Sequence, residues 1–276
     1  MHVIAYSTST HTQWVIVEGN VIIEKALTSG LNPFFMSRRE ISHVIRLELP
    51  QNFFQHRWDH VYFYGAGCAN PNKNKIVESS VIAQFKTQAT VESDLTGAAR
   101  GLLLDKQGLV SILSTGANSC HYDGEKIVKS VMSCGFIMGD EGSEAYLGKQ
   151  LVGDVLKGIA PTHLTQRFFS KFGTTPDEIM DSIYTEPQPN RKFADYSTFL
   201  SEHIADDYCR RMVYNGFLCF FERNISFYDY RNFSLSSAGT ACTLYRELFI
   251  EAARSFGAKI DRIEESPLDG LITYHS

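Results

Sequence analysis

Five short segments place small, hydroxyl-bearing or acidic residues directly after apolar runs, where they could meet a ligand. The first, Ser7 to Thr12, carries five hydroxyls among six residues and fits a hairpin turn. Backbone N–H groups and hydroxyls in such a turn can bind a phosphate. A plain hairpin has the same composition, so the segment by itself favours a turn without a ligand.

Asp94 opens the second segment, at the expected end of a strand and the start of a helix. Ligands gather at the carboxyl ends of strands in α/β sheets, so this carboxylate could act there as a general base. It could also cap the helix by accepting a backbone N–H bond. Taken alone, the position favours the cap.

The third segment, Ser114 to Ser119, and the fifth, Ala238 to Ala241, are turns rich in small residues. In the third, Gly116 permits close approach of the backbone, and Asn118 can both donate to and accept from a hydroxyl. That turn suits a phosphate or a sugar, although a simple turn remains open. The fifth suits the flat face of a nucleotide and is a weak signal in isolation.

The fourth segment, Gly135 to Ser143, sets Asp140 and Glu141 between Gly139 and Gly142, just before an expected helix. The helix dipole favours an acid in this position, which explains either carboxylate alone. Two flanking glycines and a serine are harder to explain as a cap. The segment therefore indicates a loop that binds a ligand.

Strands and helices must position these segments. A β-meander is predicted near Val3 and another near Leu109, and each leads into alternating helices and strands. A duplicated β-β-β-α-β-α unit predicts two similar α/β domains with a cleft between them. Residues 144–228 are expected to be largely helical.

Composition excludes several classes of function. The 276 residues carry a net charge of −5 with lysine and arginine scattered, which does not favour nucleic acid or an acidic membrane as partner. No apolar run reaches the roughly 20 residues of a membrane span, and the N-terminus lacks the pattern of a signal peptide. Six cysteines without a C-x-x-C pair predict reduced thiols, so a cytoplasmic location is expected.

Taken together and in this order, the segments resemble the N-acetylglucosamine kinase-like branch of the BadF/BadG/BcrA/BcrD ATPase family, in the actin/hexokinase/Hsc70-like superfamily. The similarity covers nearly the whole chain, and its most specific part is G-F-I-M-G-D-E-G-S at residues 135–143. The other motifs are F-Y-G-A-G-C (63–68), D-L-T-G-A-A-R (94–100), L-S-T-G-A-N-S (113–119) and S-P-L-D-G-L (266–271).

The resemblance implies an α/β fold of two ribonuclease H-like domains that flank an interdomain cleft. The expected N-terminal domain is 1–100, with residues 262–276 packing back on it. The expected C-terminal domain is 101–261, with a helical insertion. The implied partner is a sugar or amino sugar, and a homodimer is the commonest outcome for a protein that self-associates.

The resemblance also implies an ATP-dependent kinase acting on a primary hydroxyl of N-acetylglucosamine or a related amino sugar. Asp94 matches the acid that takes the proton from that hydroxyl. The positions implied to bind the sugar are Asn32, Ala117, Asn118, Asp140 and Glu141. The positions implied to bind ATP are Ser9, Thr10, His11, Thr115, Gly116, Gly239 and Thr240.

The chain departs from the family in its first phosphate loop, which resembles D-x-G-x-T-K-T-D-W elsewhere. Tyr6 replaces the acid that helps to hold Mg²⁺, His11 replaces the lysine and Gln13 the second acid. A neutral phenol is a poor ligand for Mg²⁺, which prefers hard anionic oxygen. In addition, Ser114 replaces a glycine and Glu144 stands where a small residue is common.

Two functions therefore remain open. One is the kinase, with ATP and Mg²⁺ as cofactors. The other is a catalytically impaired pseudokinase that keeps the sugar site as a sensor or scaffold. The family also contains ATPase activators that hold an iron–sulfur cluster, but the cysteines here occur singly, without paired cluster ligands.

Overall fold

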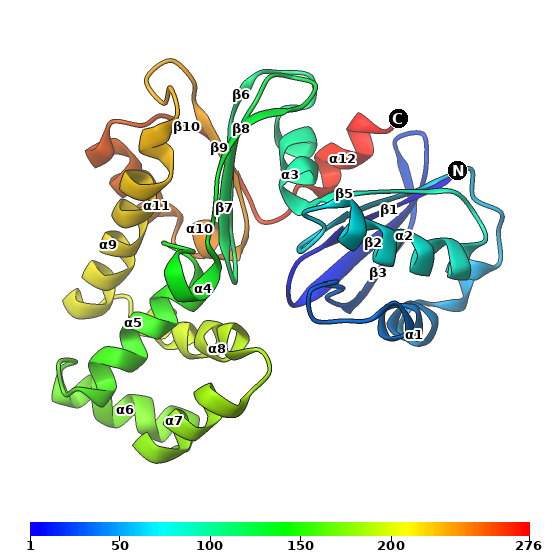
Figure 1. The fold of residues 1–276 in the computed structure, drawn as a ribbon. Coiled ribbons are helices and arrows are strands. Elements are labelled where there is room, and N and C mark those ends of the chain that lie inside the picture. The colour runs from blue at the N-terminus through cyan, green and yellow to red at the C-terminus, as the bar shows by residue number, and fades with distance from the viewer. The chain divides into compact units, whose positions relative to one another are not determined.

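Two five-stranded sheets organise the chain, and the computed structural model describes all of residues 1–276 (Figure 1). The chain divides into two units, each of which is described by itself. Unit 1 contains Met1–Val110, His121–Lys129 and Ser266–Ser276. Unit 2 contains Ser111–Cys120 and Ser130–Glu265.

The first sheet has the strand order β3-β2-β1-β4-β5. Its strands are β1 (His2–Ser7), β2 (His11–Glu18), β3 (Val21–Ser29), β4 (Val61–Gly65) and β5 (Ala89–Ser93). The first three are antiparallel, whereas β4 and β5 run parallel to β1. Ser7, Gly65 and Ser93 are neighbours in register, so the carboxyl ends of three strands meet at one edge of the sheet.

Helices cover both faces of this sheet. They are α1 (Arg38–Glu48), the short η1 (Gln51–Phe54), α2 (Pro71–Phe85), α3 (Asp94–Leu103) and α12 (Leu268–Tyr274). On one face, α1 and α2 bury Ile41 and Val77 against Trp14. On the other face, α3 and α12 contact β1 and each other, and Leu271 joins a buried cluster with Val15.

The second sheet has the order β10-β9-β6-β7-β8. Its strands are β6 (Gly108–Leu113), β7 (Ala117–Tyr122), β8 (Ile127–Val131), β9 (Leu235–Ala238) and β10 (Ile260–Glu264). Read from the other edge, the order is β8-β7-β6-β9-β10. Numbered by their order along the chain, the five strands are then arranged 3-2-1-4-5, which is also the arrangement of the first sheet. The predicted duplication of an α/β unit is therefore confirmed.

Unit 2 carries most of the helices, as expected for residues 144–228. They are α4 (Gly135–Met138), α5 (Glu144–Leu156), α6 (Thr162–Phe172), α7 (Pro176–Thr185), α8 (Pro189–Glu202), α9 (Asp207–Arg223), η2 (Ile225–Phe227), α10 (Thr240–Leu244) and α11 (Arg246–Phe256). α5 packs against α8 and α9, and α9 packs against α11. No helix of the chain is long and apolar enough to cross a bilayer, and all six cysteines are free thiols.

One helix begins earlier than the apolar pattern predicts. Apolar residues recur only from Ile76 onwards, but α2 begins at Pro71. Asn70 caps it by accepting a bond from the backbone N–H of Lys73 at 3.1 Å, and Pro71 suits the first position because its missing N–H needs no partner there. Polar residues fill the early turns, so apolar periodicity does not reveal them.

Glycine allows α3 and α12 to pack closely. A Cβ atom on Gly270 would lie 1.7 Å from the carbonyl oxygen of Gly101, and one on Gly101 would lie 2.3 Å from the carbonyl oxygen of Pro267. These are backbone atoms, which cannot move aside as the end of a flexible side chain can. Both positions therefore require glycine.

We expect Gly270→Ala to lower the free energy of unfolding by about 3 kcal/mol, because the added methyl group forces two helices apart. Gly153→Ala, on α5, is the matched control: its Cβ would meet no atom within 4 Å, so it should stabilise by up to about 1 kcal/mol. Urea unfolding measures both changes. Equal shifts in the two variants would contradict the proposed close packing.

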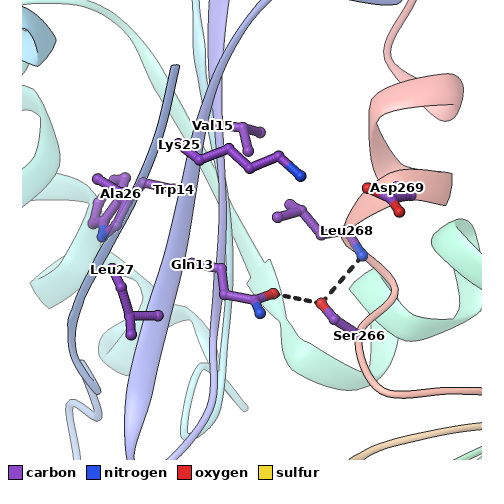
Figure 2. A pocket seen from close by; sticks show the side chains of 9 residues that line it. All are labelled: Gln13, Trp14, Val15, Lys25, Ala26, Leu27, Ser266, Leu268 and Asp269. Atoms are coloured by element: carbon purple, nitrogen blue, oxygen red, sulfur yellow. Dashed lines mark hydrogen bonds between the residues drawn. The ribbon is translucent and has the colours of Figure 1, made fainter. Parts of the chain in front are cut away.

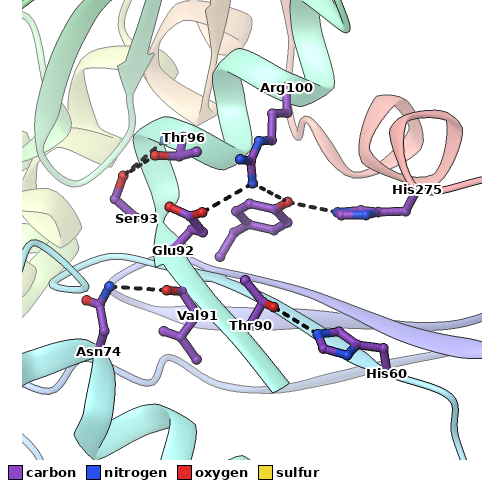
Figure 3. Close-up of polar contacts among 10 residues, drawn as sticks. His60, Asn74, Thr90, Val91, Glu92, Ser93, Thr96, Arg100 and His275 are labelled. Atoms are coloured by element: carbon purple, nitrogen blue, oxygen red, sulfur yellow. Dashed lines mark hydrogen bonds and ion pairs between the residues drawn. The ribbon is translucent and has the colours of Figure 1, made fainter. Parts of the chain in front are cut away.

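A polar network also fastens α12 to the first sheet (Figure 3). The Tyr64 hydroxyl lies 2.8 Å from His275 Nε2 and accepts a bond from Arg100 Nη1 at 3.1 Å. The His275 ring stacks on Tyr62 with 3.7 Å between ring centroids. Burial, with the nearby His2 and Arg100 charges, lowers the pKa of His275 to about 4.

This lowered pKa predicts that acid weakens the attachment of α12. His275 is neutral in the folded chain but takes up a proton below its usual pKa of 6.5 once unfolded. The contribution of His275 to stability is therefore complete above pH 6.5 and is lost as the pH falls towards 4. We expect a loss of about 1–2 kcal/mol, measured as urea midpoints at pH 7 and pH 4.5. His275→Gln should reduce this difference, and an unchanged pH dependence would argue against the assignment.

Candidate active site

The first loop, between β1 and β2, uses two of its hydroxyls for its own structure. Ser7 Oγ and Thr12 Oγ1 are buried and lie 2.8 Å apart. Ser7 Oγ also accepts a bond from the Leu31 backbone N–H at 3.0 Å. These two hydroxyls therefore fix the loop against the chain that follows β3, and Thr8 to Thr10 form its exposed part.

The exposed part of the first loop is ordered by short-range bonds. Thr8 Oγ1 accepts from the backbone N–H groups of Thr10 and His11, and Thr10 Oγ1 lies 3.1 Å from His11 Nδ1. Gly30 packs directly beneath, because a Cβ atom there would lie 2.7 Å from the carbonyl carbon of Ser9. The structure thus brings Ser9, Thr10 and His11 into one small turn.

Asn32 follows this glycine and lies in a second turn at the same edge. It is only 8% exposed, and its Oδ1 accepts from the Phe34 backbone N–H at 2.9 Å. Gly67, which has φ +81°, comes so close that a Cβ atom there would lie 2.2 Å from Asn32 Oδ1. The amide nitrogen of Asn32 bonds to no other group of the chain, so it can donate to a ligand.

Asp94 is the first residue of α3, and Ser93 is the cap. Ser93 Oγ accepts from the Thr96 backbone N–H at 3.0 Å, so the interpretation of Asp94 as the cap was wrong by one residue. Asp94 Oδ1 accepts from the Leu95 N–H at 2.9 Å. Burial raises the pKa of Asp94 to about 6, although the backbone N–H bonds oppose this shift.

Tyr6 and Cys68 lie close enough to Asp94 for its charge to act on both of them. Burial raises the pKa of Tyr6 well above its usual value, and the charge of Asp94 adds to this shift. The same two causes raise the pKa of Cys68 to about 12. Both groups therefore stay protonated, and Asp94 is the single carboxylate of this cluster. Sequence reasoning identified Tyr6 as a departure but did not predict its proximity to Asp94.

The residues of the first loop do not fit a Mg²⁺ ion. Tyr6 is neutral, and Gln13, its partner across β1 and β2, accepts a bond from Ser266 Oγ at 2.5 Å. Mg²⁺ is usually held through one or two carboxylates and phosphate oxygens in octahedral geometry. Positions 6 and 13 offer no carboxylate, so the loop lacks the donors that the family resemblance implies.

Gln13 also lines a pocket of about 440 Å³ in unit 1, under the start of α12 (Figure 2). The lining residues are Gln13, Trp14, Val15, Lys25, Ala26, Leu27, Ser266, Leu268 and Asp269. None of the residues implied to bind sugar or ATP belongs to this set. The pocket is therefore separate from the turns that carry Asn32 and Asp94.

In unit 2, Asp140 contacts the turn between β6 and β7. Its Oδ1 accepts from the Ala117 backbone N–H at 3.1 Å, and a Cβ atom on Gly116 would lie 3.1 Å from its Oδ2. Asp140 adopts φ +55°, a left-handed conformation that costs energy in a residue other than glycine. Burial raises the pKa of Asp140 to about 6, and the charge of Glu141 contributes.

Glu141 and Asn118 make local bonds as well. Glu141 is 6% exposed, pairs with Arg223 Nε at 2.6 Å, and accepts from Asn224 Nδ2 at 3.2 Å. Both of its oxygens are thus bound to the end of α9. Asn118 lies in β7, not in the turn that the sequence indicated, and its Oδ1 accepts from the Ser119 N–H at 2.9 Å.

The turn before α10 fits tightly against the end of β6. Gly239 has φ +124°, and a Cβ atom there would lie 2.2 Å from the carbonyl oxygen of Leu113. Thr240 Oγ1 donates to Glu144 Oε1 at 2.5 Å. Thr115, Gly116, Gly239 and Thr240 therefore belong to adjoining segments of unit 2. One sign of the Glu144 contact could be read from the sequence, namely a charged side chain where a small one is usual.

The fold and these loops define a two-domain α/β protein of the actin/hexokinase type. A protein of Porphyromonas gingivalis, provisionally named an N-acetylglucosamine kinase, is 36% identical, with 100% of this chain and 98% of that chain covered and a TM-score of 0.95. This chain belongs to the N-acetylglucosamine kinase-like branch of the BadF/BadG/BcrA/BcrD ATPase family, as its motifs predicted.

More distant structures share the fold alone. A protein of Chromobacterium violaceum with the same provisional name is 14% identical, with 100% and 98% of the chains covered and a TM-score of 0.77. A ROK family glucokinase of Streptomyces griseus, in complex with glucose and AMPPNP, is 12% identical, with 99% and 97% covered and a TM-score of 0.55. No model of a protein family matches the sequence, and no curated protein does.

Proposed function

We propose that the protein is an ATP-dependent sugar kinase that phosphorylates N-acetylglucosamine or a related amino sugar at a primary hydroxyl. The observation that carries the proposal is Asp94, an acid with a pKa of about 6 at the carboxyl edge of the first sheet. The provisional name of the 36% identical protein from Porphyromonas gingivalis supports the choice of sugar.

Asp94 is suited to be the general base. At neutral pH it is ionised, yet it holds a proton more strongly than an ordinary aspartate. In the proposed reaction the sugar hydroxyl gives its proton to the Asp94 carboxylate while its oxygen attacks the terminal phosphorus of ATP. The bond from that phosphorus to the bridging oxygen breaks, and ADP leaves with the electron pair. Positioning and charge stabilisation supply most of the rate of such transfers.

The remaining residues are proposed to bind the two substrates. Asn32 offers an unpaired amide nitrogen to the sugar, and Asp140 offers its second carboxylate oxygen. The other proposed sugar positions are Ala117, Asn118 and Glu141. The proposed ATP positions are Ser9, Thr10, His11, Thr115, Gly116, Gly239 and Thr240. Because the first loop does not fit Mg²⁺, we assign no step of the reaction to a metal held there.

A pseudokinase is the second candidate, and Tyr6 favours it. Loss of one charged element from a site of this kind costs on the order of 10²–10³ in rate, by analogy with single electrostatic donors elsewhere. The chain would then bind the sugar without appreciable turnover. Asn32 and Asp94, which the first-loop changes do not alter, would keep the sugar half in place.

An assay of ADP release with Mg·ATP and a panel of hexosamines tests the kinase. Release that depends on N-acetylglucosamine, and that Asp94→Asn removes, would support it. If the parent protein releases ADP no faster than Asp94→Asn does with every sugar, the kinase proposal is contradicted. Calorimetry then examines the pseudokinase: sugar binding without ATP binding supports that function, whereas micromolar affinity for Mg·ATP opposes it.

The pKa of Asp94 also predicts the acid limb of the pH profile. A base must be deprotonated to act, so kcat/KM should be constant above pH 7 and fall tenfold per pH unit below about pH 6. Initial rates at limiting sugar between pH 4.5 and 8 measure this limb. An inflection near pH 4, the range of an ordinary aspartate, would contradict the proposed environment of Asp94.

A further inference from the structure

Glu144 lies where three segments of unit 2 converge. Its backbone N–H donates to the carbonyl oxygen of Ser114 at 2.9 Å, and the next N–H, of Ala145, donates to that of Thr115 at 3.2 Å. Its side chain accepts from Thr240 Oγ1 at 2.5 Å. One residue thus joins the turn after β6, the start of α5 and the turn before α10.

The start of α5 is a place that favours an anion. The helix has 13 residues, and Ser143 caps it by accepting from the Tyr146 N–H at 3.1 Å. Helix N-termini attract negative charge, including phosphate groups, because their N–H dipoles point towards it. Here the carboxylate of Glu144, in the first turn, already supplies that charge.

No cation neutralises this carboxylate. No lysine, arginine or histidine forms an ion pair with Glu144. The charged group that acts on it is another acid, Asp195 of α8, whose own charge also acts on Arg191. Its other titratable neighbours, Cys242 and Tyr245, are neutral. Burial and the charge of Asp195 raise the pKa of Glu144, although the bond from Thr240 opposes the shift.

We infer that Glu144 is a built-in competitor of ATP, and that the nucleotide binds only when this carboxylate leaves Thr240 or takes up a proton. The inference rests on the proposed function, which assigns Thr115, Gly116, Gly239 and Thr240 to the nucleotide. A triphosphate brings several negative charges to a region that already holds one, and like charges brought together oppose binding unless one of them is neutralised. Glu144 therefore lowers the affinity for ATP and links binding to pH.

Calorimetric titration with ATP at pH 6 and pH 8 tests this role in the full chain. Glu144→Ala and Glu144→Gln should bind ATP about tenfold more tightly than the parent at pH 8. The parent should gain affinity at pH 6, and the variants should not. Because glutamine keeps a partner for Thr240, agreement of the two variants identifies charge as the cause. Titration in two buffers with different ionisation enthalpies should show proton uptake by the parent alone.

Glu247→Ala is the matched control, since Glu247 is likewise an acid in the first turn of a unit 2 helix, α11, but is exposed to solvent, unlike the largely buried Glu144. It should bind ATP as the parent does. Weaker binding by the Glu144 variants would overturn the inference and make Glu144 a contact of ATP. Equal binding by all four proteins would overturn it and leave the kinase proposal standing. No ATP binding by any of them at either pH would overturn both.

Discussion

Asp94→Asn is expected to lower kcat by about 10²–10⁴, the usual contribution of a general base, while making the folded chain more stable at pH 8. The two effects have one cause. The folded chain raises the pKa of Asp94 from 3.8 to about 6, so its environment disfavours the charge that catalysis requires. The contribution of Asp94 to stability is therefore most favourable below pH 3.8, and it becomes less favourable as the pH rises through 6.

Asparagine carries no charge, so the variant escapes this loss. We expect a gain of about 1–2 kcal/mol in the free energy of unfolding at pH 8, after allowance for the partial exposure of Asp94, and little gain at pH 4. Urea unfolding at the two pH values measures the gain, and sugar-dependent ADP release measures the rate. Lost activity with equal destabilisation at both pH values would indicate a damaged fold. It would argue against Asp94 as a base whose surroundings disfavour its charge.

Tyr6→Asp is expected to restore part of a metal site and to raise kcat with Mg·ATP by about 10². An acid at position 6 would lie near Asp94, so without a metal the two carboxylates repel each other and the variant should unfold more easily. Mg²⁺ with ADP should relieve that repulsion. Thermal unfolding with and without Mg²⁺ and ADP reports this effect independently of turnover.

Tyr6→Phe is the matched control, because it removes the hydroxyl and adds no charge. It should show neither the loss of stability nor its recovery with Mg²⁺. If Tyr6→Asp also responds to Mg²⁺ no more than the parent does, residue 6 does not determine whether the first loop binds a metal.

Much of the fold could be predicted from the sequence because local patterns carry it. Alternating apolar residues and turn residues revealed both meanders, and the repeated strand order confirmed the duplication. The bounds 1–100 and 101–261 stay a prediction. They follow the chain in order, whereas unit 1 also takes in the β7–β8 hairpin region, 121–129, which returns to it from a later part of the chain.

The site was harder to predict because its decisive bonds join distant residues. Thr240 and Glu144 are 96 residues apart, and Glu141 and Asn224 are 83 apart. Hydroxyl-rich composition could not show that Ser7 and Thr12 bond to each other and leave only the tip exposed. The family resemblance identified Asp94 as the candidate base. Its raised pKa, however, arises from burial that only the folded chain provides.

The position of α12 has a consequence for biosynthesis. This helix completes the apolar face of the first sheet, where Leu271 and Ile272 cover Ile4 and Val15, but the ribosome adds it after the whole of unit 2. A nascent chain that has already formed β1 to β5 and α3 therefore leaves the part of that face that α12 covers exposed through the synthesis of more than half of the protein. Exposed apolar surface of this kind binds chaperones and promotes aggregation. Slow translation of unit 2 should make the first sheet the most vulnerable part of the unfinished chain.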